Sequence, residues 1–256
     1  ALPSSPSESA LSPWLVVHVP DWVWTFNRVL IAFAVSSVTL LSFWWSYSRH
    51  RTPLIAPALL KIRSFAWSNV TAILFSAAFA AGLLSNILWL QEAWGYSALR
   101  TGFAVSPGPL LVPLFAIAGG SLTRRYSAGR VAALGSLLWA VGTVLVLVSV
   151  DTTPNYAAGL LPGWIIAGIG VGLALPTILS QATADLAPAR SATGSALVSM
   201  SRQIGTVLGV RVLIAVLGSA VDSATFRQAW WVIFAVALVS ALASLGMTPA
   251  TTPTPV

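Results

Sequence analysis

Few side chains in this 256-residue sequence could carry out acid–base, nucleophilic or metal chemistry. There is no cysteine, and the two histidines, His18 and His50, are too few for a multi-histidine metal cluster. The six acidic residues all lie at the ends of apolar stretches or between them. We therefore predict that the chain is not an enzyme and that it uses no metal ion and no cofactor.

The polar side chains that stand out are arginines and amides within apolar stretches. Arg202 and Arg211 lie in one such stretch, on roughly opposite faces if it is helical. A charged side chain inside a membrane is expensive and usually functional, although a long arginine can also snorkel to the interface or bond a carbonyl. Asn86, Gln181 and Gln203 could contact a solute or simply tie helices together.

Long apolar stretches are the elements that must position these side chains. Hydrophobic residues make up 57% of the chain and charged residues 7%, whereas a soluble domain has about 25% charge. A helix needs roughly 20 apolar residues to cross a bilayer. We predict an all-α membrane protein with seven spans, at Val29–Tyr47, Phe65–Leu90, Gly102–Leu122, Val131–Val150, Tyr156–Ser180, Ala192–Val221 and Ala229–Met247.

The basic residues predict the orientation of these spans. They gather in alternate loops at helix ends rather than on one face, which argues against nucleic-acid binding despite the net charge of +7. The loops at 48–64, 123–130 and 181–191 are therefore expected in the cytoplasm. The N-terminal segment is then outside and the tail Thr248–Val256 inside. Tryptophans near span ends are expected to be interface anchors: Trp44, Trp45, Trp67, Trp89, Trp94, Trp230 and Trp231.

Prolines and glycines are concentrated in the later spans. Pro107, Pro109 and Pro113 each remove a backbone donor, so we expect this helix to line a cavity or to pack deep inside the protein. Small residues at four-residue spacing let helix backbones approach closely, either for packing alone or for faces that slide during transport. We assign helix packing to Gly168, Gly172, Gly205 and Gly209.

Four segments, in order, resemble the fourteen-span drug–proton antiporters of the major facilitator superfamily. They are Leu90–Leu111, Gly119–Gly135, Leu161–Thr177 and Ala189–Val210, and the resemblance extends from about Trp24 to Leu245.

The resemblance implies the domain organisation. Residues 1–28 would be an extracellular loop, 29–47 a linking transmembrane helix and 48–64 a cytoplasmic loop. Residues 65–247 would be the six-helix C-terminal bundle, built from two inverted three-helix repeats, and 248–256 a cytoplasmic tail. The resemblance implies an N-terminal six-helix bundle as well, which would be missing from this sequence.

A cytoplasmic loop motif of the family is only partly present. Gly120, Leu122, Arg125 and Arg130 match it, whereas Arg124 stands where the family has an acid and Ser127 where it has a second glycine. The resemblance implies that this acid helps to hold one conformation, so its loss puts that gating role in doubt for this half.

The leading hypothesis is the C-terminal portion of a proton-coupled multidrug efflux antiporter in the cell membrane. Its partners would be the lipid bilayer, a hydrophobic or cationic small molecule, protons and the missing bundle, and not nucleic acid. A non-transporting or truncated membrane subunit is the alternative, and a receptor or membrane enzyme fits the pattern less well. On the leading hypothesis, cavity or gate residues are expected at Asn86, Gln181, Arg202, Gln203 and Arg211.

Overall fold

A computed structural model describes residue 59, residues 61–218 and residues 222–247. The chain divides into two units at Ala56 and Pro57, and these described residues all belong to the second unit. The predicted first span, Val29–Tyr47, lies outside them. So do the N-terminal segment and the tail Thr248–Val256.

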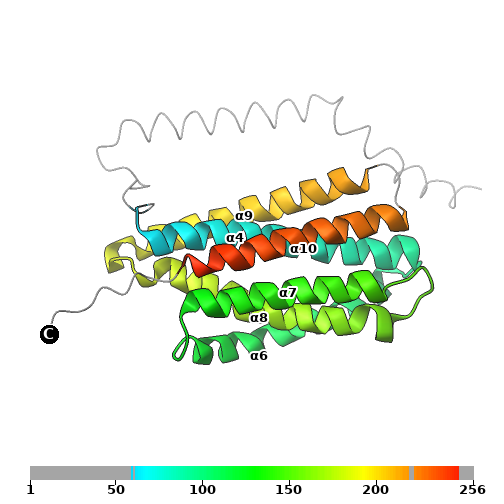
Figure 1. Ribbon diagram of the computed structural model, residues 1–256, viewed down its shortest axis with the longest axis horizontal. Coiled ribbons are helices and arrows are strands. Elements are labelled where there is room, and N and C mark those ends of the chain that lie inside the picture. The colour runs from blue at the N-terminus through cyan, green and yellow to red at the C-terminus, as the bar shows by residue number, and fades with distance from the viewer. Residues whose placement is uncertain (1–58, 60, 219–221, 248–256) are drawn as a thin grey trace, which may run out of the picture. The chain divides into compact units, whose positions relative to one another are not determined.

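The described residues form helices and no strand (Figure 1). The elements are α4 (Arg63–Leu88), η1 (Trp89–Ala93), α5 (Ala98–Val105), α6 (Pro107–Leu122), α7 (Ala128–Ser149), η2 (Tyr156–Leu160), α8 (Leu161–Ala184), α9 (Pro188–Leu217) and α10 (Ser223–Leu245). The π-helical turns η1 and η2 extend α4 and α8, and α5 runs almost directly into α6. Six helices in the described part are therefore long and apolar enough to cross a membrane. The predicted all-α membrane class is confirmed.

The helices pack in a pattern that repeats. If α4, α6 and α7 form one triplet and α8, α9 and α10 another, the first helix of each triplet packs on the second and third helices of the other. α9 and α6 consequently lie at opposite edges of the bundle, α9 against α4 and α6 against α8 (Figure 1). This exchange is the arrangement expected of two inverted three-helix repeats.

Glycines set how closely the helices approach. A Cβ on Gly168 would lie 2.6 Å from the Gly108 carbonyl oxygen of α6, and one on Gly209 would lie 2.7 Å from the Ala77 Cα of α4. Gly172 faces Phe115, and Gly205 faces the backbone of Ile73. All four glycines assigned to packing therefore lie where one backbone meets another.

Aromatic side chains fill the core at the end of the bundle where α4 ends and α10 begins. Trp89 and Trp230 are 3% and 2% exposed, and their rings lie 5.3 Å apart between centroids. Trp94 is also buried, and its Nε1 donates to the Asp151 carbonyl oxygen at 2.8 Å. These three differ from the expected anchoring role, because Trp89 and Trp230 pack on each other and Trp94 bonds the Asp151 turn.

Candidate functional site

The larger of two neighbouring cavities lies between α4, α6, α7 and α8. Its volume is about 260 Å³, and its lining is almost entirely apolar. The lining residues are Phe79, Gly108, Pro109, Val112, Pro113, Trp139, Trp164, Gly168, Val171 and Leu175. We call this space the apolar chamber.

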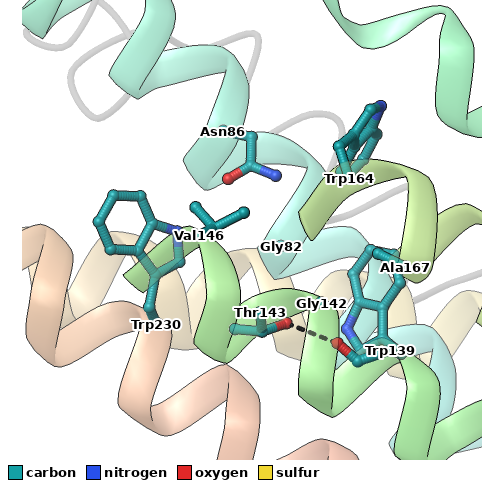
Figure 2. Close-up of a pocket in the computed structure, with 9 residues that line it drawn as sticks. All are labelled: Gly82, Asn86, Trp139, Gly142, Thr143, Val146, Trp164, Ala167 and Trp230. Carbon is teal, nitrogen blue, oxygen red and sulfur yellow. Dashed lines mark hydrogen bonds between the residues drawn. The ribbon is translucent and has the colours of Figure 1, made fainter. Parts of the chain in front are cut away.

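A smaller cavity of about 10 Å³ adjoins it and contains an amide, and we call it the amide chamber (Figure 2). Asn86 of α4 is 5% exposed, and its Oδ1 atom has no hydrogen-bond partner in the structure. Thr143 of α7 also lines this chamber, but its hydroxyl donates to the Trp139 carbonyl oxygen at 2.9 Å. The remaining lining residues are Gly82, Trp139, Gly142, Val146, Trp164, Ala167 and Trp230.

Trp139 and Trp164 line both chambers, so the two chambers meet at these indole rings. Their ring centroids are 6.0 Å apart in an edge-to-face arrangement, which is a favoured geometry for aromatic pairs. Trp139 fits beside α4 because residue 82 is glycine: a Cβ there would lie 2.6 Å from Trp139 Cζ2. The shape of the site therefore depends on two indole rings held between helices.

The carbonyls that prolines free in the broken helix α5–α6 accept one hydrogen bond from α8 and one from within the break. Pro109 has no N–H to give the Val105 carbonyl, and Trp164 Nε1 donates to that oxygen at 2.8 Å. Pro107 likewise frees the Phe103 carbonyl, which accepts from the Ser106 hydroxyl at 2.9 Å. The expectation that this helix lines a cavity is met, because Pro109 and Pro113 line the apolar chamber. It does not pack deep inside, because both prolines are exposed in the described bundle.

Of the five residues predicted for a cavity or gate, the structure places Asn86 alone in these chambers. Gln181 lies at the end of α8, where its Nε2 is 3.4 Å from Asp185 Oδ2. Arg202 is half-buried on α9 with an unpartnered Nε, whereas Gln203 and Arg211 are exposed. A gate role for these four stays a prediction that concerns surfaces outside the two chambers.

The residues of the predicted loop motif lie between the last turn of α6 and the first turn of α7. Gly120 and Leu122 close that helix, Arg125 lies in the turn, and Arg130 lies in the first turn of α7. Both arginines are exposed. The carboxylate of Asp185, at the same end of the bundle, accepts a hydrogen bond from the Ser64 hydroxyl at 2.5 Å. This bond joins the start of α4 to the end of α8.

Sequence reasoning missed the two tryptophans that shape the site. Trp139 and Trp164 lie inside spans, in contrast to the tryptophans at span ends. An indole inside a span needs a partner for its N–H, or a cavity to line, and that position was the available signal.

The sequence was compared with known proteins. The family model described as Major Facilitator Superfamily matches residues 9–210 and, in an overlapping match, residues 70–256. The chain is 26% identical over 189 residues to a multidrug resistance protein B homolog of Mycobacterium tuberculosis, covering 73% of this chain and 35% of that protein. It is 23% identical over 207 residues to the methylenomycin A resistance protein of Streptomyces coelicolor, covering 81% and 43%.

A third relative is the cephamycin export protein CmcT of Amycolatopsis lactamdurans, 27% identical over 204 residues, covering 77% of this chain and 40% of that protein. The chain thus spans less than half the length of these relatives. The match of the family model over most of the sequence, together with six packed membrane-length helices, shows that the chain belongs to the Major Facilitator Superfamily.

Proposed function

We propose that this chain is the C-terminal portion of an efflux transporter that expels hydrophobic or cationic small molecules across the cell membrane. The observation that carries the proposal is the apolar chamber, which includes side chains of α4 and α8, the first helices of the two triplets. The relatives' names support small-molecule cargo, since they concern multidrug resistance, methylenomycin A resistance and cephamycin export.

An N-terminal six-helix bundle is part of this proposal, because transport by alternating access requires two bundles that move around a site between them. α6 and α9 are the least buried of the six spans, with 17% and 22% of their most apolar windows buried. Their outer faces would contact that second bundle. Residues 1–28, 29–47 and 48–64 would form the outside loop, linking helix and cytoplasmic loop that lead into the bundle at 65–247.

Coupling to inward proton flow also belongs to the proposal. Within the described residues the acids lie in loops or at helix ends: Glu92, Asp151, Asp185 and Asp222. A proton-carrying acid inside the membrane would therefore come from the N-terminal bundle.

Efflux of a fluorescent dye from cells that express the whole transporter tests the function. We expect efflux that stops when an uncoupler removes the proton gradient, and none from this chain alone. Val112→Trp should reduce efflux because Val112 lines the apolar chamber. Leu242→Trp should not, because Leu242 is 69% exposed on α10, away from the proposed contact with the second bundle, and lines neither chamber. Equal efflux by both variants would contradict the assignment of the chamber.

Cysteine labelling tests the orientation, since the chain has no native cysteine. Tyr126→Cys, in the turn after α6, should react with an impermeant thiol reagent only after the cells are opened. Thr153→Cys, in the turn before η2, should react in intact cells. The reverse result would invert the proposed topology, with its outside N-terminal segment and cytoplasmic tail.

A further inference from the structure

Asn86 differs from another buried asparagine on the same helix. Asn69 is 9% exposed, its Nδ2 donates to the Phe65 carbonyl at 2.8 Å, and its Oδ1 accepts from the Ser201 hydroxyl at 2.8 Å. Asn86 is more deeply buried, and its Oδ1 accepts from nothing in the structure. A buried carbonyl oxygen without a donor is unfavourable, and such a group calls for a specific explanation.

The donors that line the amide chamber with Asn86 are engaged or lie on its far side. Trp164 Nε1 donates to Val105, and Trp230 Nε1 donates to the Ser85 hydroxyl at 3.2 Å. The Thr143 hydroxyl donates to the Trp139 carbonyl. Trp139 Nε1 also lacks a partner, but Figure 2 shows it near Thr143, at the far side of the amide chamber from Asn86. Trp89 Nε1 lacks a partner as well, but Trp89 does not line this chamber. A molecule that enters the chamber can therefore supply the donor that Asn86 Oδ1 lacks.

The volumes of the two chambers indicate the size and shape of a molecule that would fit them. The amide chamber holds a group about the size of one water molecule, such as a hydroxyl. The apolar chamber next to it has room for an aromatic body between Phe79, Trp139 and Trp164. Phe79, Gly82 and Asn86 follow one face of α4 from one chamber to the other.

The lining also favours an uncharged ligand, because neither chamber has a charged residue among its described lining residues. A cation placed there would lose its hydration and gain only the faces of aromatic rings, with no carboxylate partner. We propose that these chambers bind neutral aromatic molecules with a terminal hydroxyl group, which donates to Asn86 Oδ1. This inference rests on the proposed function, and it assigns any cationic cargo to a different part of the transporter.

Paired probes test the inference by equilibrium dialysis of the 256-residue chain in nanodiscs against protein-free nanodiscs. The probes are 2-naphthol and 2-fluoronaphthalene, which have similar shapes but differ in the hydroxyl donor. Relative to the wild type, Asn86→Leu should lower the ratio of naphthol affinity to fluoronaphthalene affinity by about three- to tenfold, the range of one neutral hydrogen bond. The affinity for 2-fluoronaphthalene should stay within about twofold, since the apolar chamber is unchanged.

Asn69→Leu is the matched control, because it removes a buried amide from the same helix outside both chambers. It should leave the affinity ratio unchanged. Asn86→Ala should lower the ratio as Asn86→Leu does, which provides a second variant if leucine disturbs folding. An unchanged ratio in both Asn86 variants, or an equal loss in Asn69→Leu, would overturn the inference. Failure of efflux with the selective binding intact would count against the transport function instead.

Discussion

α6 and α9 occupy equivalent places in the two triplets but are built differently. Each packs on the first helix of the other triplet and leaves much of its surface exposed. α9 runs without a break over 30 residues, whereas α6 and α5 are interrupted at Ser106 and Pro107. The outer face of α6 carries large apolar side chains such as Leu110 and Ile117, but that of α9 also carries Gln203 and Arg211.

The difference shows two ways of attaching a helix to its neighbour. α9 brings its own glycines against α4, so the contact depends on backbone proximity. α6 combines close packing at Gly108 with a directional bond from Trp164 to a carbonyl that a proline has freed. α9 should therefore respond most to added volume and α6 most to lost hydrogen bonds.

The largest effect is expected from adding a methyl group to α9. Gly209→Ala should lower the free energy of unfolding by about 2–3 kcal/mol, because the new Cβ meets the Ala77 backbone, which cannot move aside easily. Thermal unfolding in detergent measures the change. Gly120→Ala on α6 is the control, since a Cβ there meets nothing within 4 Å, and it should be neutral or slightly stabilising. Equal losses in the two variants would remove the contrast.

Removing the bond that supports α6 should have the next largest effect. Trp164→Phe should lower the free energy of unfolding by about 1–3 kcal/mol, because the Val105 carbonyl loses its donor. Pro109→Ala gives that carbonyl a backbone N–H, so Trp164→Phe should cost less in its presence. A double-mutant cycle measures the coupling. Additive losses would show that the indole acts through packing alone.

Arg211→Leu should reduce transport function without lowering the stability of this chain. Arg211 is exposed in the described bundle, so the melting temperature of this chain should stay the same or rise slightly. Resistance conferred by the whole transporter should fall if α9 contacts the N-terminal bundle there. Val207→Leu, 58% exposed on the same helix, serves as the control. A more stable protein with unchanged resistance would discard a role for Arg211.

The smallest effect is expected at the start of α10. Hydrogen bonds from Thr225, first from its backbone N–H, hold the pKa of the Asp222 carboxyl below its ordinary value. A lowered folded-state pKa stabilises the fold above the unfolded-state pKa, and that contribution is lost as pH falls through the folded-state pKa. Asp222→Ala should therefore melt slightly lower than the wild type at pH 7, and the gap should narrow in acid. Asp222→Asn, which keeps a capping oxygen, should show a weaker pH dependence.

Positions of helices were readable from the sequence, but their partners were not. Predicted spans such as Phe65–Leu90 and Val131–Val150 agree with α4 and α7 to within a few residues, because an apolar run long enough to cross a bilayer has few other solutions. The prolines signalled freed carbonyls in the broken helix α5–α6. The donors, however, come partly from Trp164, which is distant in sequence, so the break and its support needed the folded structure.

The candidate site was predictable to a smaller extent. Asn86 was singled out as an amide in a span, and it lines a chamber. Gln203 and Arg211 met the same rule yet lie exposed, because a polar residue in a span indicates a need for a partner and not which neighbour supplies it. Trp139 and Trp164 carried no polar signal strong enough to be chosen.

The indole pair shared by the two chambers also gives the site an intrinsic fluorescence signal. Trp139 and Trp164 are close enough for their excited states to exchange energy, and both border the space where a ligand would lie. A molecule that enters changes the polarity around both rings at once. The chain has 12 tryptophans, so the change in emission on binding that is lost both in Trp139→Phe and in Trp164→Phe is the part that reports occupancy of the chambers.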